Sequence, residues 1–198
     1  IAPHLVEPLP FLIPFDGPFD RFYYGAGLML YDLLAGERNV GRRRHLTRDQ
    51  VANLEPNFAL DGLASAAIYF DCAVHSARLV LENIFDAARD GAVACNYARF
   101  EEYRRESGLF EVKVTDVVRG ESFAVTARAL VDTTGPWQRT AKLRLVRGSH
   151  LVLPRLNSSD NAIAYFNADG RIIFVIPWGA EHELSLVGTT DCDHDSGP

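Results

Sequence analysis

The fold of this chain is decided by residues 162–188, which read AIAYFNADGRIIFVIPWGAEHELSLVG. Three short runs in this stretch are rich in β-branched and aromatic side chains, and they predict strands at 162–167, 171–177 and 183–188. The first two runs are separated by Ala-Asp-Gly at 168–170, a sequence that favours a tight hairpin turn. The stretch therefore predicts consecutive antiparallel strands in the second half of the chain.

Further strands are predicted on the N-terminal side of this stretch. Residues 93–98, 109–115 and 122–126 are short β-rich runs, and Ser-Gly and Arg-Gly pairs separate the later ones. This spacing predicts an antiparallel meander, which leads into another strand at 128–133. Residues 145–153 predict one more strand directly before the stretch that decides the fold.

The first half of the chain shows helical spacing instead. Residues 20–34 place apolar side chains on one broad face, and Gly36 follows as a stop. Thr47 opens a Thr-Arg-Asp-Gln capping box, which predicts a short helix that ends before Pro56. Residues 76–89 repeat apolar side chains at helical spacing and predict a third helix. Helices followed by strands indicate an α+β fold with a mixed or antiparallel sheet.

The opening residues are rich in proline. Residues 1–15 carry four prolines and no basic stretch, which is unlike a signal peptide. Because proline has no N–H to donate to a neighbouring strand, we expect irregular chain or an edge strand up to Pro18.

Composition narrows the class of protein. The chain has 198 residues, of which 47% are hydrophobic and 23% charged, as in ordinary globular proteins. Its 20 basic and 26 acidic residues give a net charge of −6, which argues against a nucleic-acid partner. No apolar run reaches the roughly 20 residues of a membrane span. Three widely spaced cysteines without a Cys-x-x-Cys pair favour buried thiols over a disulfide framework or a zinc site.

Three short motifs invite chemistry that the sequence does not support. Residues 25–27, Gly-Ala-Gly, lack the third glycine and the preceding strand of a dinucleotide-binding turn. Residues 42–45, Arg-Arg-Arg-His, are best interpreted as a solvated loop, although an anion or lipid headgroup is an alternative. Asp191, Asp193 and Asp195 have the spacing of a calcium loop, but Ser196 stands where such a loop needs glycine. We therefore predict no metal site.

Four strings, taken in order, carry a resemblance. They are Tyr69-Phe-Asp with Ala77-Arg-Leu-Val-Leu81; Thr134-Gly-Pro-Trp137; Arg147-Gly-Ser-His-Leu-Val-Leu-Pro-Arg155; and Ile176-Pro-Trp178 with Gly188-Thr-Thr-Asp191. The ordered set resembles the FAD-dependent, respiratory, quinone-reducing glycerol-3-phosphate dehydrogenases over essentially the whole chain. Three features depart from that family: His75 and Ser76 replace two usual acids, Arg147 replaces a usual lysine, and the link at 138–142 is short.

The resemblance implies that this chain is an internal fragment of a longer enzyme. Residues 1–92 correspond to a helical and substrate-domain part, residues 93–137 to antiparallel strands that return to the FAD domain, and residues 138–198 to the substrate-binding sheet. The Gly-rich FAD fingerprint would precede Ile1, and a substrate-binding arginine would follow Pro198. We therefore expect that this fragment by itself does not retain FAD and is inactive.

The resemblance also implies site residues. His150 is the candidate catalytic residue, because an imidazole with a reference pKa of about 6.5 suits a base beside a reacting hydroxyl. Arg144 and Arg147 are candidates for binding the substrate phosphate. The candidate cofactor-binding residues are Thr134, Gly135, Thr189 and Thr190, which offer hydroxyls, amides and, at glycine, close backbone approach.

The implied reaction is oxidation of sn-glycerol 3-phosphate to dihydroxyacetone phosphate, with hydride transfer to FAD and electrons passed to quinone. The implied location is the cytoplasm, with peripheral contact at the inner face of the cell membrane as an option for the full-length protein. Two alternatives stay open. One is a related FAD oxidoreductase that acts on another 2-hydroxy acid or on an amine, and the other is a subdomain with no binding activity of its own.

Overall fold

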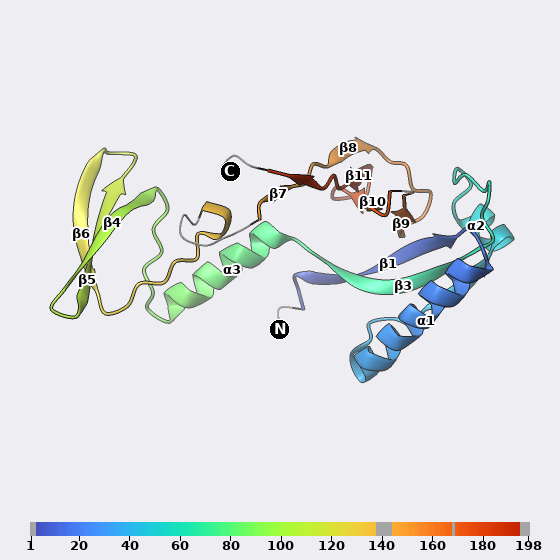
Figure 1. The fold of residues 1–198 in the computed structure, drawn as a ribbon, viewed down its shortest axis with the longest axis horizontal. Coiled ribbons are helices and arrows are strands. Elements are labelled where there is room, and N and C mark those ends of the chain that lie inside the picture. The colour runs from blue at the N-terminus through green and yellow to red at the C-terminus, as the bar shows by residue number, and fades with distance from the viewer. Residues whose placement is uncertain (1–2, 138–143, 168, 195–198) are drawn as a thin grey trace. The chain divides into compact units, whose positions relative to one another are not determined.

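A computed structural model describes residues 3–137, 144–167 and 169–194. The chain divides into two compact units (Figure 1). The first unit joins residues Ile1–His75 and Val146–His194, and the second contains residues Ser76–Leu145.

A seven-stranded sheet forms the first unit. Its strand order is β2-β3-β1-β9-β10-β11-β8. The strands are β1 (Val6–Phe15), β2 (Arg44–Thr47), β3 (Ser65–Val74), β8 (Leu151–Pro154), β9 (Ala162–Phe166), β10 (Ile172–Trp178) and β11 (Leu184–Gly188). Only the pairing of β1 with β9 is parallel. Two short strands, β7 (Val146–Arg147) and β12 (Cys192–Asp193), pair with each other. The predicted α+β class with a mixed sheet is confirmed.

The prediction for the opening residues was wrong, because β1 lies inside the sheet. It pairs with β3 along all ten residues and with β9 only at Phe11 and Leu12. Successive N–H groups of a strand point to opposite edges, so prolines at 8, 10 and 14 remove donors from one edge only. The other edge keeps its donors. This explains how a proline-rich strand sustains one full-length pairing and one short pairing.

One helix packs against each face of this sheet, over the part formed by β1, β2 and β3. On one face, α2 (Arg48–Leu54) packs Val51 against Leu12 and Ile68. On the other, α1 (Pro18–Ala35) places Tyr24 and Leu28 against a second core cluster. Neighbouring residues of β1 alternate between the two clusters, as the two-residue period of a strand requires.

The three predicted helices are confirmed. α1 covers the predicted 20–34 and meets Gly36 as its C-cap, followed by the 3₁₀ turn Gly36–Arg38. At the start of α2, the Thr47 side chain accepts a hydrogen bond from the Gln50 amide, and the Gln50 side chain accepts one from the Thr47 amide. The third helix is α3 (Ser76–Arg89). No helix in the described part of the chain is long and apolar enough to cross a bilayer.

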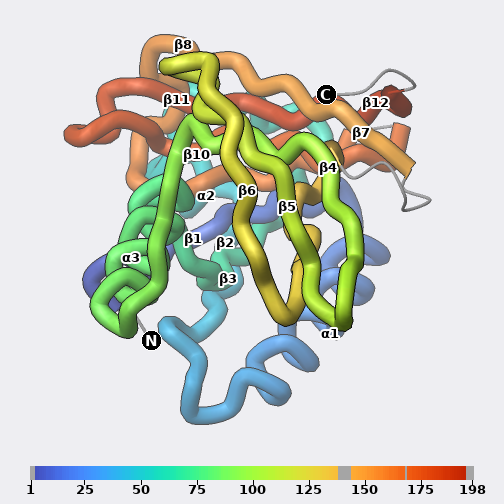
Figure 2. The backbone as a smooth tube through the Cα atoms, turned by 90° about the vertical axis from the view of Figure 1, so that its left-hand side faces the viewer, coloured from blue at the N-terminus to red at the C-terminus, as the bar shows by residue number. Residues whose placement is uncertain are grey.

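The second unit combines α3 with a three-stranded antiparallel sheet in the order β4-β5-β6 (Figure 2). Its strands are β4 (Ala98–Glu106), β5 (Leu109–Asp116) and β6 (Glu121–Ala127). The predicted meander is confirmed for its second and third strands. The first was misplaced, because the strand begins where 93–98 ends. Its charged sequence ARFEEYRRE hides the alternation, and a register shift between Phe100 and Glu102 breaks it further.

Two other strand predictions were wrong. Residues 128–133, which follow β6, form no strand. No strand in the described ranges pairs with them. The predicted strand at 145–153 is broken into β7 and β8 by an irregular segment at 148–150. The hairpin between β9 and β10 is confirmed by the Asn167–Arg171 backbone bond, whereas Ala168 of its turn lies outside the described residues.

Candidate active-site segment

The break between β7 and β8 places His150 beside the end of β11. Residues 148–150 lie against residues 188–190, and the two segments are joined by hydrogen bonds. The Ser149 amide donates to the Thr190 hydroxyl at 2.9 Å, and the Thr190 amide donates to the Ser149 carbonyl at 3.3 Å. We call this pair of segments the clasp. It brings His150 beside Thr189 and Thr190, which lie far from it in sequence.

The His150 imidazole is exposed at the clasp. Residues Val187 and Leu151 are partners in the register of β11 and β8, so one further step places His150 opposite Gly188. Neither ring nitrogen of His150 has a hydrogen-bond partner among residues 3–137, 144–167 and 169–194. Both nitrogens are therefore available to a ligand as donor or acceptor.

The two threonines of the clasp use part of their hydrogen-bonding capacity within it. The Thr189 hydroxyl donates to the Thr190 carbonyl at 3.0 Å, and the Thr190 hydroxyl accepts from the Ser149 amide. A hydroxyl has one hydrogen and two lone pairs. Thr190 thus keeps a hydrogen to donate, and Thr189 keeps lone pairs to accept. Thr189 and Thr190 therefore also help to hold the segment that contains His150, a role that the sequence did not predict.

The other candidate residues lie elsewhere. Arg147 is an exposed residue of β7, where it pairs with Cys192 of β12 in the first unit. Arg144, Thr134 and Gly135 belong to the second unit. The Thr134 hydroxyl donates to the Asp132 carboxylate at 2.6 Å. Gly135 begins the 3₁₀ turn Gly135–Trp137 with a positive φ of 61°, which favours glycine there.

A polar network that includes the buried Glu55 carboxylate, and that the sequence did not reveal, supports the loop after β8. The Glu55 carboxylate is 2% exposed and accepts bonds from the Ser158 and Ser159 amides and the Ser159 hydroxyl. The Arg155 guanidinium donates to the Asp160 carboxylate and to three carbonyls. These bonds fix residues 155–161, which connect the strand that follows His150 to β9. Glu55 could not be assigned to this loop from sequence, because 103 positions separate it from Ser158.

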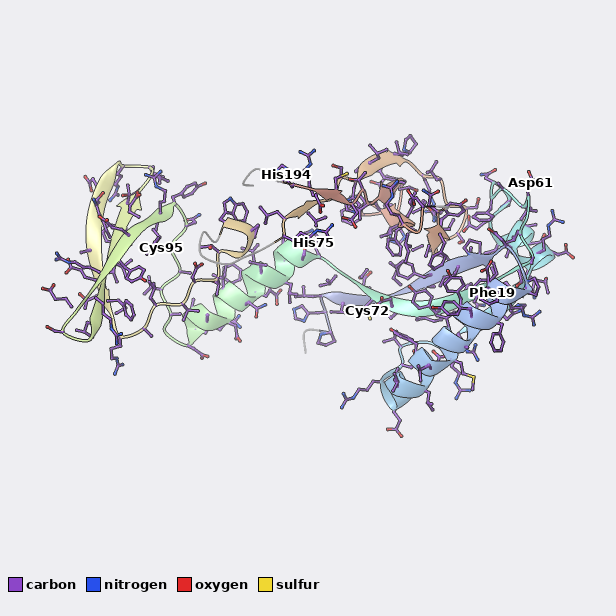
Figure 3. The ribbon with its side chains drawn as sticks, viewed as in Figure 1. Phe19, Asp61, Cys72, His75, Cys95 and His194 are labelled. Carbon is purple, nitrogen blue, oxygen red and sulfur yellow. The ribbon has the colours of Figure 1, made fainter. Side chains whose placement is uncertain are left out.

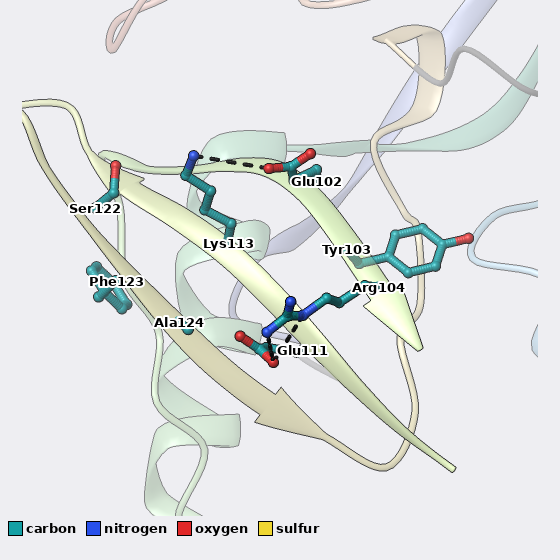
Figure 4. A pocket seen from close by; sticks show the side chains of 8 residues that line it. All are labelled: Glu102, Tyr103, Arg104, Glu111, Lys113, Ser122, Phe123 and Ala124. Atoms are coloured by element: carbon teal, nitrogen blue, oxygen red, sulfur yellow. Dashed lines mark hydrogen bonds and ion pairs between the residues drawn. The ribbon is translucent and has the colours of Figure 1, made fainter. Parts of the chain in front are cut away.

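A surface hollow elsewhere is a different feature, and the charged side chains that line it are paired. It lies on the three-stranded sheet, where Arg104 pairs with Glu111 at 2.8 Å and Lys113 pairs with Glu102 at 3.9 Å (Figure 4). These charges neutralise one another. No group of three or more His, Cys, Asp or Glu side chains that could hold a metal occurs in the described part of the chain. Asp195, the last acid of the calcium-like spacing, lies outside it.

The cysteines are not buried, contrary to the sequence interpretation. Cys72 lies on β3, Cys95 lies between α3 and β4 (Figure 3), and Cys192 lies on β12. All three are free thiols with exposed side chains.

The class of protein follows from a family comparison. The model of the family described as FAD dependent oxidoreductase matches residues 19–198. The chain belongs to this FAD-dependent oxidoreductase family, which confirms FAD as the family cofactor and confirms the predicted enzyme class.

Individual relatives sharpen the comparison. The chain is 34% identical to an alpha-glycerophosphate oxidase of Streptococcus pyogenes serotype M18 and 31% identical to an aerobic glycerol-3-phosphate dehydrogenase of Staphylococcus epidermidis. Each match covers 98% of this chain, which spans 35% and 37% of those proteins. Among solved structures, the glycerol-3-phosphate dehydrogenase of Bacillus halodurans complexed with FAD matches 98% of the chain with a TM-score of 0.75 and 26% identity. The match covers 36% of that protein. The predicted resemblance is thereby confirmed.

Proposed function

We propose that the full-length protein containing this chain oxidises sn-glycerol 3-phosphate to dihydroxyacetone phosphate. The observation that carries the proposal is the exposed imidazole of His150, held by the clasp in a chain that relatives acting on glycerophosphate match from end to end. The chain spans about a third of those relatives, so the reaction needs residues beyond it.

His150 supplies the proton chemistry of the proposal. Oxidation of the substrate alcohol removes a proton from the C2 hydroxyl and a hydride from C2. The neutral imidazole accepts the hydroxyl proton at one ring nitrogen, and FAD, when bound, supplies the acceptor for the hydride. Neither ring nitrogen of His150 has a hydrogen-bond partner within the described part of the chain, so no hydrogen bond to those residues has to break before the substrate hydroxyl binds.

The phosphate-binding and cofactor-binding roles belong to the same proposal. Arg147 and Arg144 are guanidinium groups that bind phosphate in a fork-like geometry. Thr189 and Thr190 use the hydrogen-bonding capacity that their hydroxyls retain to bind FAD. The backbone at Thr134 and Gly135 also contacts FAD in this proposal. A Cβ added at Gly135 meets nothing within 4 Å, so the described residues leave open space there for a cofactor edge.

Kinetics of the full-length enzyme test the role of His150. His150→Ala is expected to lower kcat for glycerol 3-phosphate by about 10²–10⁴-fold, the usual cost of losing a general base. His150→Asn keeps a hydrogen-bonding group without a base and separates the two contributions. His45→Ala, a change at another exposed histidine, serves as the matched control. Unchanged kcat in His150→Ala would rule out the base.

Substrate class is tested with the same preparation. Under anaerobic conditions, glycerol 3-phosphate is expected to bleach the flavin absorbance, while lactate, glycine and proline are not. Reduction by one of those acids or amines, and not by glycerol 3-phosphate, would replace the proposal with the alternative substrate class.

The proposal includes the assignment of residues 1–92, 93–137 and 138–198 to the three parts of the enzyme described above.

We also propose that this chain alone binds no FAD. The only Gly-Ala-Gly motif, at 25–27, lies in the middle of α1 and not at a helix N-terminus, where phosphate groups bind. Flavin fluorescence during titration of the purified chain tests this expectation. Micromolar or tighter binding would contradict it.

A quinone acceptor and a cytoplasmic location at the inner membrane face complete the proposal. The sequence resemblance to the respiratory enzymes supports both. Turnover of the full-length enzyme with a soluble quinone in the absence of oxygen tests the acceptor. Turnover only with oxygen would exclude it, and fractionation of cells tests the location.

A further inference from the structure

Gly188 meets the His150 ring directly. In the register of β10 and β11, Gly188 pairs with Phe174, and on its other side it lies one step beyond the Val187–Leu151 pair. A Cβ placed on Gly188 would lie 2.5 Å from Cδ2 of His150, 2.9 Å from Cγ and 3.2 Å from Nε2. Real Cβ atoms essentially never approach other heavy atoms within 3.0 Å. The imidazole therefore occupies the space that any other side chain would need.

A positive φ does not explain this glycine. Eight glycines of the described chain have a positive φ, the conformation that favours glycine, and Gly188 is not among them. Alanine could adopt the local backbone without strain of that kind. What excludes a side chain at position 188 is the imidazole, and what the absent side chain permits is the approach of the ring to the β11 backbone.

We propose that Gly188 is a positioning residue, which sets the orientation of the His150 imidazole for the reaction by letting the ring rest on the end of β11. The inference rests on the proposed function, because it assigns a role to Gly188 through His150. The clasp fixes the backbone of residues 148–150, and Gly188 fixes the side chain. Together they fix both the position and the direction of the ring nitrogens.

The proposal predicts a specific defect in Gly188→Ala. The His150 side chain is exposed, so it can rotate away from the new methyl group while the sheet stays intact. Displacing a reacting group by about 1 Å can lower a rate by roughly 10²-fold. We therefore expect kcat to fall by about 10²-fold in the FAD-loaded, full-length enzyme, with little change in KM and with bound flavin unchanged.

A double-mutant cycle distinguishes positioning from general damage. If Gly188 acts through His150, adding Gly188→Ala to His150→Ala lowers kcat no further. If the two losses multiply, Gly188 acts independently and the proposal fails. Gly27→Ala is the matched control, because a Cβ there meets nothing within 4 Å. Wild-type kcat in Gly188→Ala would also overturn the proposal.

A second readout does not depend on turnover. Crystal structures of the wild-type and Gly188→Ala holoenzymes are expected to show the ring against Gly188 in the first and rotated away in the second. If Gly188→Ala does not fold, the wild-type structure and the double variant decide, because removing the ring should restore folding. A wild-type ring away from Gly188 would overturn the inference. If the ring moves as expected but glycerol 3-phosphate does not reduce the wild-type flavin, the proposed function fails and the steric relationship stands.

Discussion

The two main sheets of this chain differ in what stabilises them. The seven-stranded sheet has a buried core on each face, with Leu12 on one and Phe15 on the other. The three-stranded sheet has one buried apolar residue, Val112, which is 7% exposed. Two rows of three apolar residues nevertheless share one face, because partners in register point to the same side: Phe100–Val114–Phe123 and Tyr103–Val112–Val125.

The difference shows where each sheet obtains its stability. Burial of apolar area dominates the first sheet, at about 25 cal/mol per Å². The second depends on backbone pairing, exposed apolar contacts and ion pairs such as Arg104–Glu111, within the part of the chain that the structure describes. Substitutions in the two sheets should therefore differ in the size of their effects and in their response to salt and pH.

The largest effect is expected for Leu12→Ala. Leu12 is fully buried, and removing a buried leucine side chain costs about 2–5 kcal/mol of unfolding free energy. Val112→Ala removes fewer buried atoms from a sheet with a smaller apolar core, so it should lower the free energy of unfolding by clearly less. Urea unfolding, followed by hydrogen exchange at amides of each sheet, measures the two losses separately. Equal losses would contradict the difference between the sheets.

A smaller loss is expected for Glu55→Ala. The change leaves the part-buried Ser158 and Ser159 amides without their acceptor. A fully buried donor left unsatisfied costs about 1–3 kcal/mol, so we expect a loss near the lower end of that range. Hydrogen exchange at these two amides should accelerate, while exchange in β5 should not change. Glu55→Gln keeps one acceptor oxygen, so its exchange rates at these amides should lie between those of the wild type and Glu55→Ala. Unchanged protection of both amides in Glu55→Ala would remove the role assigned to the carboxylate.

Local sequence signals were sufficient where a segment determines its own structure. The capping box at Thr47, the spacing of 76–89 and the hairpin of β9 and β10 predicted the observed elements, because each signal lies within a few residues of its effect. Strand β1 was different. Its prolines indicated an edge, and only the pairing with β3 and β9, which are distant in sequence, makes it an inner strand.

The candidate site shows the same limit. The string at 147–155 identified His150 through a family resemblance, and the fold then placed it beside 188–190. Neither the break in the strand at 148–150 nor the contact between Gly188 and His150 could be derived from local propensity. Both depend on the register of β8 and β11, which is set by long-range pairing.

Alkaline pH should weaken the seven-stranded sheet. Burial, together with the nearby Asp71 carboxylate, raises the pKa of Tyr69, on β3, to about 12. The phenol of an unfolded chain has a pKa of about 10. The folded state therefore holds this proton more tightly, so its contribution to stability is complete below pH 10 and is lost as pH rises from 10 to 12. Urea unfolding at several pH values should show a shallower decline for Tyr69→Phe than for the wild type. Identical slopes would contradict the assignment.

The smallest expected effect concerns salt, to which the three-stranded sheet should respond and the seven-stranded sheet should not. The Arg104 guanidinium donates to the Glu111 carboxylate through Nε at 3.1 Å and Nη2 at 2.8 Å, which raises the pKa of Arg104. Both side chains are exposed, so dissolved ions screen their attraction, over about 10 Å at 0.1 M salt and about 3 Å at 1 M. Raising sodium chloride should accelerate amide exchange in β5 of the wild type. In Glu111→Gln the same addition should have less effect, and amides around Leu12 should not respond. If salt accelerated exchange equally in both sheets, ion pairing would not be what distinguishes them.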